Sequence, residues 1–171
     1  MEADHPVVPR PIASRLTPEE EDEHAMLKLY SVDLDAAANA LRMLRRYRLS
    51  DIRHCLLREA TMAYCRPFSG NRGRTIKNRK HQLHADAVPG DLRPLHDDLI
   101  RRRDGLIAHT DAQARNPQVS RWPVGNGFAY FLGFAHGDWA ALDKQADTML
   151  SLIAAVTTRL HAKIRDLEAK I

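Results

Sequence analysis

Arg103 and His109 are the two residues of this chain whose types are best suited to catalysis, and they lie six positions apart in the segment RDGLIAH. A guanidinium stabilises the negative charge that develops on a phosphate, through charge-assisted hydrogen bonds. An imidazole exchanges protons near neutral pH and therefore acts as a general acid or base. Together the two side chains suit a site that binds a phosphate and transfers a proton.

Both residues also have an ordinary structural interpretation. Apolar side chains at helical spacing over positions 92–110 place Arg103 on the apolar stripe of a predicted helix, where an unpartnered charge is costly. A salt bridge to Glu59 or Asp104 would satisfy it, and composition alone favours that reading over a phosphate or an open cleft. His109 at a helix end is in turn favoured by the helix dipole.

The spacing of Arg103 and His109 bears on the number of chains in the site. In a regular α-helix, six positions correspond to about 120° around the axis and about 9 Å along it, so the two side chains do not share a face. Arginine and histidine from two copies could still line one groove across a two-fold axis. We therefore expect a homodimer.

A strongly basic segment is the second candidate site. Residues 66–84 contain six cations and no acid, against a net charge of +4 for the whole chain. RNA phosphates would stabilise such a cluster, although a solvated loop, or one neutralised by the acidic residues near the N-terminus, is an equal alternative. Arg101 and Arg102 are expected on a solvated helix face. The predicted RNA-binding set is Arg66, Ser69, Asn71, Arg72, Arg74, Lys77, Arg79, Lys80, Arg102 and Thr110; its serine, asparagine and threonine are also common turn or cap residues.

Periodicity and helix-start signals predict an all-α fold, an antiparallel bundle of four helices at about 17–47, 51–65, 91–111 and 138–170. The expected N-caps are Thr17, Ser50 or Asp51, Asp91 and Asp138. Residues 1–16 read as an extended tail, 17–171 as one domain, and 66–90 as a long basic loop. The apolar seam of the last helix continues to Ile171, farther than the other helices are expected to cover it.

The connector before the last helix is rich in aromatic residues. Val119–Val124 and Phe128–Leu132 flank a Gly-Asn-Gly turn and predict a short β-hairpin. Six of the ten aromatic residues of the chain lie between positions 122 and 139. A small additional core that caps the bundle is the favoured interpretation, and base stacking is the alternative.

The cysteine and histidine content argues against a disulfide-rich secreted protein and against a metal site. The two cysteines, Cys55 and Cys65, form no metal-ligand spacing and are expected to be small core residues in a protein of the reducing cytoplasm. His81 and His84 have a ligand-like spacing, but no nearby cysteine or acid completes a metal set. We expect no metal, no cofactor, no signal peptide and no membrane span.

The Arg-x5-His segment, the preceding turn Tyr64-Cys65-Arg66-Pro67-Phe68-Ser69 and the order of helices resemble the HEPN superfamily, in particular its abortive-infection U group, over about residues 20–165. The resemblance implies a metal-independent endoribonuclease of the toxin or phage-defence type that acts as a dimer and is often paired with an antitoxin protein. It implies Arg103, Asp104 and His109 as catalytic residues, with Asp104 where the family commonly has asparagine. The alternative is a non-catalytic helical interaction or nucleotide-binding module.

Overall fold

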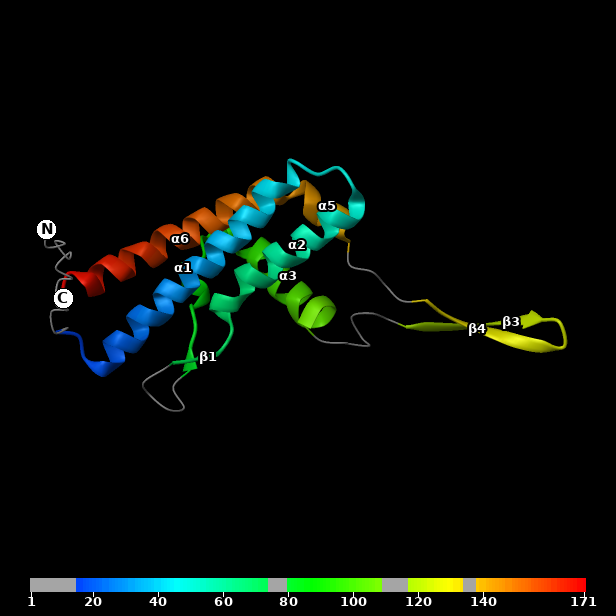
Figure 1. The fold of residues 1–171 in the computed structure, drawn as a ribbon, viewed down its shortest axis with the longest axis horizontal. Coiled ribbons are helices and arrows are strands. Elements are labelled where there is room, and N and C mark those ends of the chain that lie inside the picture. Colours follow the sequence, from blue (N-terminus) through cyan, green and yellow to red (C-terminus); the bar gives the residue numbers. More distant parts are fainter. Residues whose placement is uncertain (1–14, 74–79, 109–116, 134–137) are drawn as a thin grey trace, which may run out of the picture.

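The computed structural model describes residues 15–73, 80–108, 117–133 and 138–171. The prediction of a mainly helical protein is confirmed (Figure 1). The helices are α1 (Pro18–Leu44), α2 (Ser50–Cys65), α3 (Arg93–Arg102), α5 (Trp139–Lys144) and α6 (Ala146–Glu168). Short turns are η1 (Arg66–Phe68), η2 (Ala85–Ala87), η3 (Gly90–Leu92) and the π-helical η4 (Arg103–Ala108). Two antiparallel hairpins join β1 (Asn71–Arg72) to β2 (Lys80–His81) and β3 (Gln118–Val124) to β4 (Gly127–Gly133).

The start of α1 is fixed by local sequence, as predicted. The Thr17 side chain accepts a hydrogen bond from the backbone N–H of Glu20, and the Glu20 carboxylate accepts one from the backbone N–H of Thr17. Pro18 occupies the first helical turn, where a missing N–H costs nothing. This capping box satisfies two backbone donors and sets the first residue of the longest helix.

The central helices α1 and α6 run antiparallel along the body of the protein (Figure 1). Lys170 Nζ lies 2.6 Å from Glu20 Oε1, and Lys28 Nζ lies 2.7 Å from Glu168 Oε1, so the start of α1 meets the end of α6. The apolar seam of α6 is buried as far as Leu167. The expectation that this seam extends beyond its cover therefore holds only for its last residue, because the seam is covered as far as Leu167 and Ile171 is 50% exposed.

Two of the expected N-caps are wrong. The N-cap of α2 is Leu49, and α3 begins after Leu92, which ends the turn η3; neither residue makes a side-chain capping bond. The Asp138 cap is confirmed, because its carboxylate accepts a hydrogen bond of 2.8 Å from the backbone N–H of Ala141.

The last two predicted helices are shorter or broken. The α-helical part of α3 ends at Arg102, where the chain widens into η4 instead of continuing to residue 111. The last predicted helix is divided at Gln145 into α5 and α6. Gln145 serves both as C-cap of α5 and as N-cap of α6. The hydrophobic periodicity continues through this break, so the sequence pattern does not reveal it.

The inward face of α2 includes one of the two cysteines of the chain. Leu57, Thr61 and Tyr64 are fully buried, together with Cys65. Cys55, which was expected in the core, is exposed. The prediction for Cys65 is confirmed.

The basic segment is not one continuous loop. The turn η1 follows α2 directly, and the short ribbon pairs Asn71 with His81 and Arg72 with Lys80. The backbone N–H of Leu83 donates to the Pro67 carbonyl at 2.7 Å, which ties the outgoing strand to η1. The ribbon therefore brings residues 73 and 80 together at the base of the segment 74–79, which lies outside the described residues.

The predicted β3–β4 hairpin is confirmed, including its Gly-Asn-Gly turn, with Gly125 at a φ of 55°. The predicted aromatic core is wrong: the four aromatic residues of the hairpin are between 55% and 67% exposed. The hairpin extends away from the helices (Figure 1). Trp139 alone of the described aromatic residues in this stretch packs on the body, with its ring centroid 4.8 Å from that of His54.

None of the helices in the described ranges combines the length and the apolar character needed to cross a membrane.

Candidate functional site

The candidate site is built where α3 changes into η4. Residues 103–108 form a π-helical turn, a distortion that occurs frequently at functional sites. A π-turn holds more residues than an α-turn, so the predicted angle between Arg103 and His109 does not apply. His109 itself, like Thr110, lies outside the described residues.

Arg103 is held between two segments that are distant in sequence. Its Nη1 donates to the Ser69 hydroxyl at 2.6 Å, and its Nε lies 2.7 Å from Asp104 Oδ1. The Nε atom is buried and makes no aligned hydrogen bond, so the contact with Asp104 is an ion pair rather than a directed bond. The side chain keeps 20% of its surface exposed. Of the two acidic partners weighed from the sequence, Arg103 therefore meets Asp104.

Ser69 holds the guanidinium in place. Its Oγ donates to the Cys65 carbonyl at 3.0 Å while it accepts from Arg103. A hydroxyl has one donor and two acceptor positions, so these bonds fix its direction. Ser69 therefore orients Arg103 and has one acceptor position left.

Asn71 stabilises the same turn. Its Nδ2 donates to the carbonyls of Ser69 and Arg66 at 2.8 and 2.9 Å, and it lies 3.3 Å from the Tyr30 hydroxyl. Burial raises the pKa of Tyr30, so its hydroxyl stays protonated at neutral pH. Asn71 thus links the turn that holds Ser69 to α1.

The predicted RNA-binding cations are not equivalent. Arg66 Nη1 lies 3.1 Å from Asp33 Oδ1 and its Nη2 lies 4.0 Å from Glu59 Oε1, so acids of α1 and α2 neutralise it. Arg72 and Lys80 are exposed on the short ribbon. Arg74, Lys77 and Arg79 lie outside the described residues.

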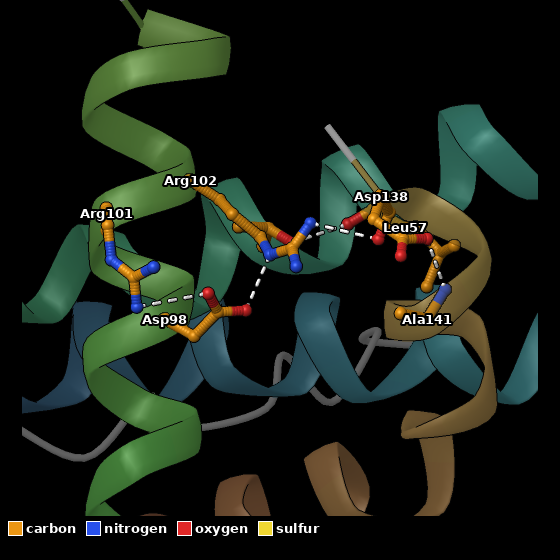
Figure 2. A network of polar contacts seen from close by, with 7 residues as sticks. Leu57, Asp98, Arg101, Arg102, Asp138 and Ala141 are labelled. Carbon is orange, nitrogen blue, oxygen red and sulfur yellow. Dashed lines mark hydrogen bonds and ion pairs between the residues drawn. The ribbon is translucent and has the colours of Figure 1, made fainter. Parts of the chain in front are cut away.

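Arg102, the neighbour of Arg103, is part of a structural network (Figure 2). Its Nε lies 2.6 Å from Asp98 Oδ2, and its Nη1 donates to the Asp138 carbonyl at 3.1 Å, so it links α3 to the first turn of α5. Only 15% of the side chain is exposed, so the prediction of a solvated face is wrong for Arg102. It is confirmed for Arg101, which is 75% exposed although it also pairs with Asp98.

A buried aromatic cluster beside the site was not anticipated from the sequence. The Tyr64 hydroxyl lies 2.8 Å from His96 Nδ1, and the Phe68 ring packs on both. Burial raises the pKa of Tyr64 and lowers the pKa of His96, so both groups are neutral at pH 7 and share one hydrogen bond. The signal in the sequence is that position 96 lies between apolar Leu95 and Leu99 on the inward side of α3.

Cys65 lies within the field of Arg103 but is not activated by it. Burial raises the pKa of the thiol to about 12, although the Arg103 charge lowers it in part. A thiol with this pKa is protonated at neutral pH. Cys65 is therefore not a nucleophile.

A second polar contact, also not anticipated, closes the base of the basic ribbon. His81 Nε2 lies 3.6 Å from Asp22 Oδ2, and both side chains are more than nine-tenths buried. A Cβ at Gly73 would lie 2.1 Å from that carboxylate oxygen and 2.8 Å from the imidazole, so this position requires glycine. A cavity of about 380 Å³ next to the pair is lined partly by Lys80 and Lys163.

The described side chains form no group of three or more His, Cys, Asp or Glu residues able to hold a metal ion. A scan against protein-family models finds no match to the chain, and searches of curated proteins and of solved structures likewise return no similar protein. The resemblance to the HEPN superfamily therefore rests on the residues and the order of elements alone.

Proposed function

We propose that this chain is an HEPN-like RNA-binding protein that cleaves RNA without a metal ion. In this proposal α1, α2, α3 and α6 are the four helices of the bundle, and η4 carries the Arg-x5-His segment. RNA is the substrate, and an antitoxin protein is the expected partner in the cell. No metal or cofactor enters the proposed reaction.

The observation that carries the proposal is the hydrogen bond between Arg103 and Ser69. These residues belong to the two sequence motifs that suggested the family, and 34 positions separate them. The fold brings both motifs to one place, and the serine there fixes the arginine rather than neutralising it. Ser69 is an uncharged partner of Arg103, and its second partner, Asp104, is an exposed carboxylate that an arriving anion would have to replace on the guanidinium.

The chemistry follows from the two side chains. His109 takes the proton of the 2′-hydroxyl or returns one to the leaving oxygen. Arg103 stabilises the charge that the phosphate gains when the hydroxyl attacks. Asp104 holds the Arg103 Nε in the absence of RNA and, being 54% exposed, yields this contact to the arriving phosphate.

Cations on the ribbon would hold the RNA strand. Arg72 and Lys80 are exposed on β1 and β2, and the segment 74–79 between them adds three further cations. Such contacts act mainly on the phosphate backbone and confer little sequence specificity.

The direct experiment is incubation of the purified chain with total RNA in excess EDTA. We expect cleavage by the wild type, and a rate lower by about 10²- to 10⁴-fold for His109→Ala. His161→Ala is the matched control, because its imidazole bonds to Ser31 on α1, and it should cleave normally. A folded wild type that cleaves none of the RNA offered would refute the enzymatic part.

A non-catalytic RNA-binding module is the second candidate, and the Arg103–Asp104 ion pair favours it. If this pair keeps the site closed, Asp104→Asn should convert a protein that binds RNA without cleavage into one that cleaves it. A variant that binds RNA but still does not cleave it would support the binding module.

A further inference from the structure

The β3–β4 hairpin is apolar on both faces. Its register pairs Trp122 with Ala129 and Ser120 with Phe131, which places Trp122 and Phe131 on one face. The opposite face carries Tyr130 and Phe128, each on β4. A hairpin that lies on its own protein alternates between a buried apolar face and a solvated polar face, and this one does not.

The exposed apolar area is large enough for a protein interface. Seven large apolar residues of the hairpin are between 55% and 71% exposed: Val119, Trp122, Val124, Phe128, Tyr130, Phe131 and Leu132. Together they expose on the order of 800 Å², which is the area that one partner contributes to a standard interface. A two-stranded hairpin is also only marginally stable in water without packing on one face.

The charge of the hairpin argues against nucleic acid as the partner. Arg121 is the only charged residue of the two strands, and its guanidinium carbon lies 3.4 Å from the Phe128 ring centroid. Binding to a phosphate backbone depends on several cations, so one arginine gives little affinity. A surface that is extensive, apolar and nearly uncharged is typical of a permanent contact between protein subunits.

We propose that the hairpin is an arm exchanged between two copies of this chain. One face of the hairpin, with Trp122, Val124 and Phe131, packs on the same face of the partner's hairpin across a two-fold axis. The other face lies on the helices of the partner. A single kind of partner then covers both faces, and the contact is self-complementary, as a two-fold interface requires. The proposal does not depend on RNA as the substrate.

The first test is the molar mass of the full chain by light scattering at micromolar concentration. We expect twice the 19.4 kDa of one chain for the wild type and a monomer for the double variant Trp122→Ser and Phe131→Ser. Loss of a central interface tryptophan weakens association by roughly 30-fold or more. The matched control, Leu49→Ser with Ile171→Ser, changes two apolar residues outside the helices that are 68% and 50% exposed, and it should remain a dimer.

Disulfide formation tests the geometry independently of these variants. In a Cys55→Ser background, Ser120→Cys should give an oxidised dimer in high yield, whereas Leu49→Cys should not, because only Ser120 shares the proposed contact face with Trp122 and Phe131, and its replacement keeps both of these side chains. The buried Cys65 stays reduced in both. A monomeric wild type would overturn the proposal, as would a double hairpin variant that remains a dimer. A monomer whose Trp122 fluorescence is quenched by single-stranded RNA would instead assign the hairpin to RNA.

Discussion

Arg102 and Arg103 are adjacent in sequence and differ in every contact they make. Arg102, at the end of α3, pairs with a carboxylate and a backbone carbonyl that join two helices. Arg103, at the start of η4, donates to a serine and meets an exposed carboxylate. Since their exposed fractions are similar, 15% and 20%, the partners rather than the exposure distinguish the two arginines.

The change from α3 to η4 produces this difference. While the helix is regular, successive side chains point about 100° apart, and Arg102 points to Asp98 one turn earlier. At the start of the π-turn, Arg103 instead reaches Ser69, the residue that follows η1. The segment RDGLIAH therefore begins where the regular α-helix ends.

The largest expected effect is on Arg103. Arg103→Ala should lower the rate of RNA cleavage by about 10²- to 10³-fold, because it removes a donor directed at the developing phosphate charge. Arg103→Lys should not restore the rate, since an ammonium lacks the planar fork. Gel assays of a labelled RNA measure the rate, and circular dichroism confirms folding. A normal cleavage rate in folded Arg103→Ala would contradict the catalytic role proposed for Arg103.

Arg102→Ala should act on stability instead. Removal of its ion pair and its bond to the Asp138 carbonyl should lower the free energy of unfolding by about 2 kcal/mol. Arg101→Ala, the matched control, should change it by less than about 0.5 kcal/mol, because the side chain is largely solvated. Urea titration measures both. Equal decreases for the two variants would contradict the structural role of Arg102.

His96 provides a pH-dependent test of the buried cluster beside the site. Because burial lowers the pKa of His96 below its ordinary value of about 6.5, the unfolded chain binds a proton at a higher pH than the folded chain does. The free energy of unfolding therefore decreases as the pH falls below about 6.5. The decrease stops once the pH is below the lowered pKa, where the folded chain is protonated too. The slope is at most about 1.4 kcal/mol per pH unit.

His96→Gln keeps a polar partner for Tyr64 and cannot titrate in this range. The difference in unfolding free energy between wild type and His96→Gln should therefore shift against the wild type as urea titrations move from pH 7.5 to 5.5. A constant difference would show that His96 does not titrate in the expected direction.

The smallest expected effect concerns the ribbon. Replacement of Arg72 and Lys80 by glutamine should lower the slope of log affinity against log salt by roughly 0.7 for each phosphate that the ribbon no longer neutralises. The free energy of unfolding should change by less than about 0.5 kcal/mol, since both side chains are exposed. Filter binding at several salt concentrations measures the slope. An unchanged slope would show that the ribbon does not touch RNA.

Much of the fold could be predicted from local signals. The start of α1 was predictable because capping-box residues satisfy nearby backbone groups, and the hairpin because its turn needs glycine. The position of the hairpin relative to the helices could not be predicted. A pattern of apolar residues indicates that they favour burial, but it does not indicate which surface covers them. The helix break at Gln145 leaves no gap in the apolar pattern either.

The candidate site was predictable in part. Glu59 and Asp104 were the two acidic partners expected for Arg103, and the structure has Asp104. The contact of Arg103 with Ser69 depends on the π-turn, which no spacing rule predicts. The partners of Arg102 come from its own helix and from the start of α5, so its burial depends on a tertiary contact 36 positions away.

The Asp22–His81 contact beside Gly73 affects which sequence changes the basic segment can tolerate. Because Asp22 and His81 secure one end of the ribbon and the Pro67–Leu83 bond secures the return strand, the intervening chain is anchored independently of its own sequence. Doubling the length of such a connection adds only about 0.6 kcal/mol of closure entropy. Insertions and substitutions between positions 74 and 79 can therefore change the length and charge of this segment without cost to the helices.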